Sequence, residues 1–218
     1  MTSTAPLTMG VPLAKAQVIC VFVHGRGQSP EAMQESVIQH LSAQGVAYIL
    51  PRAPNGSWYD ARAVDALTDD TRTALAGSLA QIDGLVSAAH TAHPHIPMLI
   101  GGFSQGACLA LEYAFSNGPW NGALAAFTGC RVGTVSDDRP AKPLETLPVY
   151  LTGSDADPWI PLAAFADAAH ALGRARARVR ADIFPGRAHE PSPAEIAVLN
   201  TVLAELASGQ TPTLEGRP

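Results

Sequence analysis

Short apolar runs alternate with helical segments along most of the chain, and this alternation limits the possible folds more than any other feature. Residues 16–23 are short, apolar and β-branched, and residues 46–50 and 98–103 have the same character, which is typical of buried strands. Between them, residues 68–92 place apolar side chains every three or four positions, as an amphipathic helix does. This order predicts an α/β protein whose mostly parallel sheet carries helices on both faces.

The rest of the chain fits the same alternation. A helical segment at 192–207 has Ser192 as its N-cap, a proline next and Glu195 at the third helical position. The stretch 128–148 predicts a long loop within the domain. A chain of 218 residues without an interdomain linker predicts one domain over residues 1–208 and a frayed tail over 209–218. Further strands are expected at 123–129, 149–153 and 175–184, and further helices at 30–43, 105–115 and 161–172.

Composition and charge exclude several classes of partner. The chain is 47% hydrophobic and 15% charged, with a net charge of −5. The arginines of residues 174–180 alternate with Ala and Val, as on the solvated face of a strand, so no nucleic acid is expected as a partner. Three cysteines without a CxxC pair do not indicate a disulfide framework. No leader peptide or membrane span is recognisable, which predicts a cytoplasmic protein without stable membrane association.

Ser104 lies in the sequence Gly102-Phe103-Ser104-Gln105-Gly106, which fits the pattern G-x-S-x-G. An apolar strand is expected before it and an apolar helix after it, which is the context of a nucleophilic serine on a sharp strand-to-helix turn. The alternative interpretation is a Gly-Ser turn without chemistry. The turn would raise the hydroxyl above the edge of the sheet and aim the helix N-terminus at it.

A serine nucleophile needs a base, and the base needs an orienting carboxylate, which in this topology follow in the order Ser, Asp or Glu, His. Asp155 and Asp157 come just after the strand expected at 149–153, and His189 follows the next strand. All three groups would meet at the carboxyl edge of the parallel sheet, where such folds bind ligands. The spacing alone leaves the choice between the two aspartates open.

The developing oxyanion needs hydrogen-bond donors, and two backbone segments can provide them. One is the N–H of Gln105, and the other is the loop His-Gly-Arg-Gly at 24–27 after the first buried strand. His24 itself is interpreted as part of a loop-shaping turn. His90, His93 and His95 cluster before a strand, at the opposite edge, and a solvated turn is favoured over a metal site. No metal and no cofactor are expected.

Five stretches together resemble the phospholipase/carboxylesterase branch of the α/β-hydrolases, which includes bacterial carboxylesterases and acyl-protein thioesterases. The resemblance implies an α/β-hydrolase fold with about seven strands. It also implies Ser104 as nucleophile, Asp157 rather than Asp155 as the catalytic aspartate, His189 as base, the backbone of Arg26 and Gln105 as oxyanion donors, and Trp58 as an aromatic residue lining the cleft. The five stretches are HGRG at 24–27, APNGSWYD at 53–60, GFSQGA at 102–107, TGSDADPWIP at 152–161 and GRAHEPSPAE at 186–195.

The chain departs from these thioesterases at two places. Residues 52–60 form a short polar loop where those relatives carry a longer apolar one, which favours small esters over long acyl chains. The HGxG loop carries Arg26 at a position that is often aliphatic, so its guanidinium could pair with a substrate carboxylate. Tyr59 and Trp159 are further candidates for the wall of the pocket.

The expected function is hydrolysis of small carboxylic esters through an acyl-enzyme. A thioesterase or lysophospholipase acting at the same site is an alternative, and so is a catalytically silent binding or scaffold member of the fold. The only expected partners are a small-molecule ester and, as in many relatives, a second copy in a homodimer.

Overall fold

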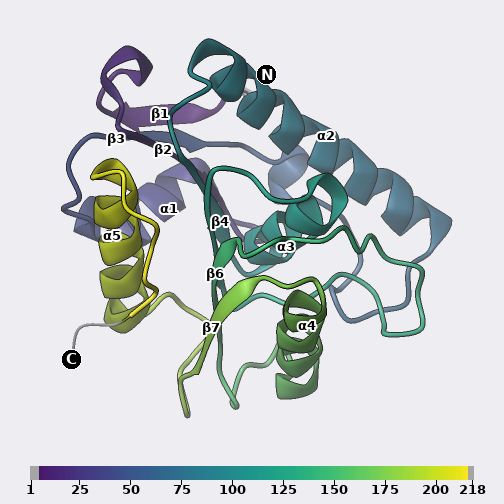
Figure 1. Cartoon of the computed structure of the whole chain (residues 1–218). Helices are drawn as coiled ribbons and strands as arrows, with labels where there is room; N and C mark the ends of the chain where they lie inside the picture. Colours follow the sequence, from purple (N-terminus) through teal and green to yellow (C-terminus); the bar gives the residue numbers. More distant parts are fainter. Residues whose placement is uncertain (1–4, 216–218) are drawn as a thin grey trace.

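A computed structural model describes residues 5–215 and contains a seven-stranded sheet (Figure 1). The strand order is β1-β3-β2-β4-β5-β6-β7, and every neighbouring pair is parallel except β1 and β3. The strands are β1 (Leu7–Gly10), β2 (Val18–Val23), β3 (Val46–Leu50), β4 (Met98–Phe103), β5 (Gly122–Phe127), β6 (Pro148–Gly153) and β7 (Arg178–Ile183). The mostly parallel sheet confirms the class that the strand and helix pattern predicted, and the arrangement is the α/β-hydrolase fold that the resemblance implied.

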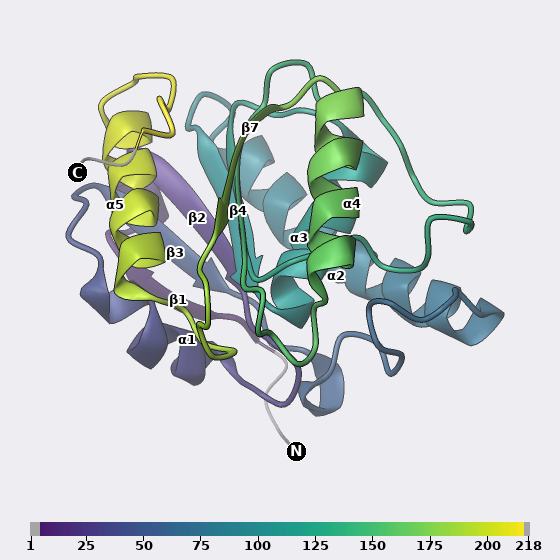
Figure 2. The ribbon, with the colours of Figure 1, turned by 90° about the horizontal axis from the view of Figure 1, so that it is seen from below.

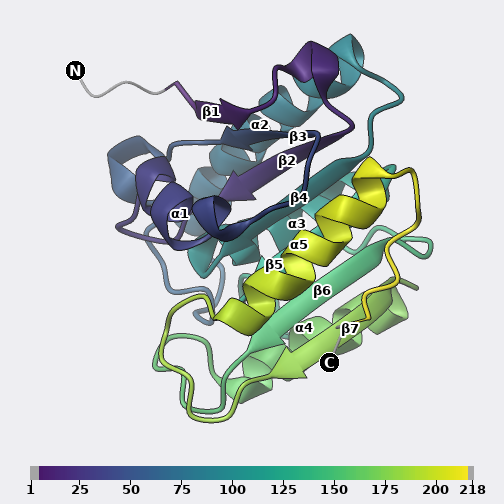
Figure 3. The same ribbon diagram turned by 90° about the vertical axis from the view of Figure 1, so that its left-hand side faces the viewer.

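Five α-helices cover the two faces of the sheet (Figure 2). Figure 3 looks onto the face covered by α1 and α5, and α2, α3 and α4 cover the other face. Short 3₁₀ turns lie at Leu13–Lys15, Ile38–His40 and Pro54–Gly56. The helices are α1 (Pro30–Ser36), α2 (Asp69–Ala92), α3 (Gln105–Asn117), α4 (Leu162–Arg174) and α5 (Pro193–Ala207).

The core lies in two layers because successive strand residues point to opposite faces of the sheet. Ile19, Val21 and Val23 of β2 pack with the buried residues of α2, α3 and α4. Val18 and Phe22 of the same strand pack with α1 and α5. All of β2 is buried, which explains why a central strand reads as a continuous apolar run rather than an alternating one.

The expected cap of the last helix is confirmed, and two elements differ from the expectation. Ser192 and Glu195 form the expected capping box of α5. The helix expected at 30–43 is only α1 and a 3₁₀ turn, because Val37 leaves helical geometry with φ −128°. The edge strand β1 was not predicted, since its four residues alternate between half-buried and exposed and show no apolar run.

The expectation of a frayed tail is wrong for residues 209–215. Leu214 is buried, and its carbonyl accepts a hydrogen bond from Arg180 Nη1 at 3.0 Å. Thr213 donates two hydrogen bonds to the Glu205 carboxylate of α5. The arginines of β7, interpreted as a solvated face, therefore hold the returning chain against the sheet. Residues 216–218 lie outside the described part.

The topology gathers the loops that follow β2, β4, β6 and β7 at the carboxyl edge of the sheet. The chain runs from β2 outward to β3 and later returns to β4 on the other side of β2, so the strand order reverses between β2 and β4. Ligands of open α/β sheets bind in the crevice at such a switch point. Within residues 5–215, no helix is both long and apolar enough to cross a membrane.

Candidate active site

Ser104 occupies the sharp turn between β4 and α3 with φ 54° and ψ −120°. This backbone conformation is rare for a residue with a side chain and is typical of a nucleophile turn. Gly102 and Gly106 are required around it, because a Cβ at Gly106 would lie 2.1 Å from the carbonyl oxygen of Val23. A Cβ at Gly102 would lie 2.6 Å from the same oxygen. The two glycines of the motif thus let β4, α3 and β2 approach closely.

The structure brings Ser104, His189 and Asp157 into one chain of hydrogen bonds. His189 Nε2 lies 2.8 Å from Ser104 Oγ, and His189 Nδ1 lies 2.7 Å from Asp157 Oδ2. The Asp157 side chain is fully buried, and its Oδ1 accepts hydrogen bonds from the backbone N–H groups of Trp159 and Ile160. These bonds fix the carboxylate in position, so it can hold the imidazole with its Nε2 toward the serine.

Asp155, the other candidate carboxylate, points away from the imidazole. Its Oδ1 accepts a hydrogen bond of 2.7 Å from the backbone N–H of Gly186, in the loop after β7. Asp155 therefore ties the loop that carries the aspartates to the loop that carries His189. This geometry separates two residues whose spacing in the sequence left the choice open.

A buried polar network behind His189 was missed by the sequence analysis. Arg187 donates to Thr128 Oγ1 at 2.6 Å and lies 3.5 Å from the fully buried carboxylate of Glu195. The Ser154 hydroxyl donates to the Arg187 carbonyl at 2.8 Å. The only sequence feature that could have indicated this network is Arg187, two positions before His189, and nothing in the sequence indicated its partners. The network holds the loop of His189 over the end of the sheet.

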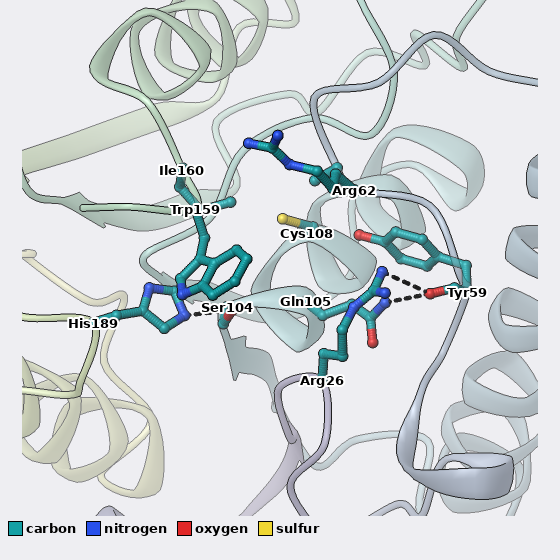
Figure 4. Close-up of a pocket in the computed structure, with 10 residues that line it drawn as sticks. Arg26, Tyr59, Arg62, Ser104, Gln105, Cys108, Trp159, Ile160 and His189 are labelled. Atoms are coloured by element: carbon teal, nitrogen blue, oxygen red, sulfur yellow. Dashed lines mark hydrogen bonds between the residues drawn. The ribbon is translucent and has the colours of Figure 1, made fainter.

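A cavity of about 260 Å³ opens beside Ser104 (Figure 4). Ser104 and His189 lie at one side of it, with Trp159 next to them. Tyr59 and Arg62 line the opposite side, and Cys108 of α3 lies between the two sides. Of these residues, Arg62 and Cys108 were not predicted to line the site. Ala63 and Ile160 complete the apolar part of the wall.

The guanidinium of Arg26, expected to bind a substrate carboxylate, is instead hydrogen-bonded to the loop after β3. It donates to the backbone carbonyls of Tyr59 at 2.9 Å, Asp60 at 2.7 Å and Ala61. Arg26 thus lines the cavity while it holds the loop after β3 in place. Three carbonyl acceptors in one turn suit the fixed fork of donors on a guanidinium.

The backbone N–H groups of Arg26 and Gln105 are the expected oxyanion donors. Gln105 is the first residue of α3, where the N–H has no partner within the helix. No acceptor for either N–H occurs within residues 5–215. The Gln105 side chain has a separate structural role, since it accepts from the N–H of Trp58 at 3.0 Å and donates to the carbonyl of Tyr59 at 2.7 Å.

Trp58 does not line the cavity, so that prediction is wrong. Its side chain is 2% exposed, lies 5.1 Å from the His24 ring and donates Nε1–H to the His24 carbonyl at 2.8 Å. The indole N–H therefore has a hydrogen-bond partner inside the protein, and the buried ring packs under the loop after β3. Tyr59 and Trp159 do line the cavity, Tyr59 buried and Trp159 58% exposed.

The remaining histidines contribute no further group to the cavity. His24 is buried, with Nδ1 2.7 Å from the carbonyl of Gly25 and Nε2 accepting from the N–H of Ala53 at 3.0 Å, which agrees with its interpretation as a turn-shaping residue. Within the described residues, no group of three or more His, Cys, Asp or Glu side chains is arranged to hold a metal ion.

The sheet topology is that of an α/β-hydrolase, and a half-buried Ser–His–Asp hydrogen-bond chain lies at its carboxyl edge. A sequence model described as phospholipase/carboxylesterase matches residues 10–207. The chain belongs to this phospholipase/carboxylesterase family, whose members include esterase- and thioesterase-type hydrolases.

Solved structures agree with this assignment. A phospholipase/carboxylesterase from Dyadobacter fermentans is 29% identical, covers 92% of this chain and 96% of its own, and superposes with a TM-score of 0.80. The acyl-protein thioesterase 2 of Zea mays shares the fold at 19% identity and a TM-score of 0.73, with 94% and 100% of the two chains covered.

A curated relative is the putative esterase NocK of Nocardia uniformis subsp. tsuyamanensis. It is 27% identical over 155 residues, which are 70% of this chain. The match spans 44% of that protein, less than half of its length.

Proposed function

We propose that this protein is a carboxylesterase that cleaves small carboxylic esters through an acyl-enzyme on Ser104. The observation that carries the proposal is the 2.8 Å contact between Ser104 Oγ and His189 Nε2, with Asp157 on the other side of the ring. His189 takes the hydroxyl proton as Ser104 attacks the ester carbonyl. Asp157 holds the imidazole in the required tautomer and stabilises the imidazolium that forms.

In the proposed mechanism, the N–H groups of Arg26 and Gln105 stabilise the oxyanion of the tetrahedral intermediate. The N–H of Gln105 belongs to the positive end of the α3 dipole, which adds to the stabilisation. His189 gives its proton to the leaving alcohol, which departs and leaves the acyl group on Ser104. A water molecule, activated by His189, then hydrolyses the acyl-enzyme and restores the serine.

The size of the cavity favours small esters over long acyl chains. Its volume of about 260 Å³ lies below the roughly 300–1,000 Å³ that is common for ligand pockets. The loop of residues 52–60 adds no long apolar cover, since Trp58 packs into the core and Arg26 holds the carbonyls of residues 59–61. This argument favours small substrates over the long acyl chains of a lysophospholipase or an acyl-protein thioesterase.

The test combines a substitution with covalent labelling. Ser104→Ala should lower the kcat for phenyl acetate by several orders of magnitude and leave about 10³-fold acceleration over water. A fluorophosphonate should label the wild-type chain and not the variant. A wild-type chain that stays unlabelled and inactive would instead indicate a silent binding or scaffold member of the family. Assays with acyl chains of increasing length on phenyl esters and on coenzyme A thioesters check the expected substrate size.

A further inference from the structure

We propose that the cavity selects esters that carry a carboxylate, with the Tyr59 hydroxyl and the Arg62 guanidinium as its binding groups. The inference rests on the proposed ester hydrolase function and names a substrate class for it. Two independent observations on the described residues support it: a buried donor without an oxygen or nitrogen acceptor, and a positive charge without an ion-pair partner on the same cavity. Neither group takes part in the proposed chemistry at Ser104.

The Tyr59 hydroxyl is a buried hydrogen-bond donor that has no oxygen or nitrogen acceptor in the described residues. The side chain is 2% exposed and lines the cavity, yet within residues 5–215 its oxygen has no oxygen or nitrogen partner, and only the weakly accepting thiol of Cys108 lies beside it. In Figure 4 the hydroxyl points toward the sulfur of Cys108 at the centre of the cavity. Burial raises the pKa of Tyr59 well above its ordinary value of 10.0, so the phenol keeps its proton and stays a donor. An unsatisfied buried donor is costly, and a ligand oxygen would remove that cost.

Arg62 adds a positive charge at the opening of the same cavity. The side chain is exposed, and among residues 5–215 its guanidinium makes no ion pair or hydrogen bond. The carboxylate of Asp65 accepts only from the backbone N–H of Arg62, at 3.1 Å. The second arginine on the cavity, Arg26, is bound by neutral carbonyls, so its charge is not cancelled by an acid.

The charge balance of the cavity is opposite to that of the whole chain. Two arginines and neither Asp nor Glu occur among the lining residues of the described chain, whereas the net charge of the sequence is −5. A positive site attracts anions, and a carboxylate oxygen can accept from a guanidinium and from a phenol at once. A neutral ester would form neither contact and would leave Arg62 to water, so an ester with a carboxylate should be preferred.

The test uses two pairs of esters that differ only in a carboxylate or a carboxamide. In the leaving-group pair, 4-carboxyphenyl acetate is compared with 4-carbamoylphenyl acetate. In the acyl pair, the phenyl monoester of adipic acid is compared with the phenyl ester of adipamic acid. The measured quantity is the ratio of kcat/KM within each pair. Because this ratio is compared between variants, the intrinsic reactivity of the esters cancels.

We expect Arg62→Gln to lower the carboxylate preference in one pair by about tenfold or more, as for the loss of a charged hydrogen bond. Tyr59→Phe removes only the hydroxyl and should lower the same ratio by about three- to tenfold. Arg174→Gln, at the exposed last residue of α4, removes the same charge away from the cavity and should leave the ratio unchanged. Added salt should reduce the wild-type preference, because the charge of Arg62 is solvent-accessible.

The outcomes separate this inference from the proposed function. Hydrolysis with the same ratio in wild type, Arg62→Gln and Tyr59→Phe for both pairs would overturn the inference and leave the esterase in place. If no ester is hydrolysed, calorimetry of monomethyl adipate with Ser104→Ala decides the matter. Binding that Arg62→Gln weakens about tenfold would support the carboxylate site without the hydrolytic function, and absent binding would overturn the site too.

Discussion

At the scale of single residues, the two aspartates after β6 show how neighbouring carboxylates acquire different tasks. Asp157 is fully buried and bonded to the imidazole, whereas Asp155 is exposed and bonded to the backbone of Gly186. The two aspartates lie two residues apart in the same loop, so only the direction of each side chain distinguishes them. The first acts on the protonation and orientation of the proposed base, and the second acts on the position of its loop.

This difference predicts unequal effects of the same substitution. Asp157→Asn should lower kcat by about 10⁴-fold, because an amide favours the wrong tautomer of His189 while the packing is preserved. Asp155→Asn keeps an oxygen acceptor for Gly186 and should change kcat by less than about tenfold. Steady-state kinetics with phenyl acetate on both variants checks this. Equal losses would mean that Asp155 shares the proposed catalytic role.

At the scale of elements, the turn between β4 and α3 depends on glycines at which an added Cβ would clash with neighbouring backbone atoms. Gly106→Ala places a methyl group 2.1 Å from the Val23 carbonyl, so β2 and α3 would have to separate. We expect a loss of unfolding free energy of about 1–3 kcal/mol or more. Gly77→Ala on α2 is the matched control, since its new methyl group meets nothing within 4 Å and the helix should gain about 0.5–1 kcal/mol. Urea unfolding of both variants measures the difference, and similar values would contradict the steric account.

The long loop between β5 and β6 depends on a buried ion pair. Arg131 donates to both carboxylate oxygens of Glu112 on α3, at 2.7 and 3.0 Å, and Glu112 also accepts from the N–H of Val132. The Arg131 guanidinium lies 3.8 Å from the centre of the Phe115 ring. Both charged side chains are at most 4% exposed, so neither could turn to water if the other were removed.

Glu112→Gln should therefore lower the unfolding free energy by about 3–5 kcal/mol, because it leaves a buried guanidinium without its counter-charge. The exposed pair between Arg176 and Glu145 provides the control, and Glu145→Gln should cost less than about 1 kcal/mol. Chemical denaturation followed by circular dichroism compares the two. A small effect of Glu112→Gln would mean that water reaches the pair.

Helices and strands could be predicted where a local sequence pattern determines them. They were harder to predict where contacts with distant parts of the chain determine them. The capping box of Ser192 and Glu195 and the apolar run of β2 are local, and both were predicted. The strand β1 forms because its backbone pairs with β3, a partner about forty residues away, and its own four residues carry no comparable pattern. Leu214 is buried for the same reason, since β7 arginines hold the tail against the sheet.

At the scale of the whole molecule, the parallel sheet determines which side chains can meet. Ser104, Asp157 and His189 are far apart in the sequence, but each follows the carboxyl end of a strand, so the topology alone brings their loops to one edge. That much could be predicted. The direction of Trp58 into the core and of Arg26 toward three carbonyls could not, because each depends on the exact path of the loop after β3.

The stability of the whole molecule should depend on pH through His24. Its Nε2 accepts from Ala53 and its Nδ1–H donates to Gly25, so the buried ring is held neutral next to Trp58. Burial is the main cause that lowers its pKa below the ordinary 6.5, and the charge of Arg52 acts in the same direction, whereas the Gly25 carbonyl and Glu31 oppose it. Below pH 6.5 the unfolded chain binds a proton at this residue that the folded chain does not, so stability falls as the pH falls.

Each pH unit in that window costs up to about 1.4 kcal/mol, and the contribution is complete above pH 6.5. His24→Gln offers an acceptor to the N–H of Ala53 but does not titrate there, so its unfolding free energy should fall less steeply with decreasing pH than that of the wild type. Urea unfolding between about pH 5 and pH 7.5 measures both slopes, and the comparison remains valid if the variant is less stable at every pH. Identical slopes would mean that the folded chain protonates His24 as readily as the unfolded chain, and that the turn after β2 opens to admit the charge.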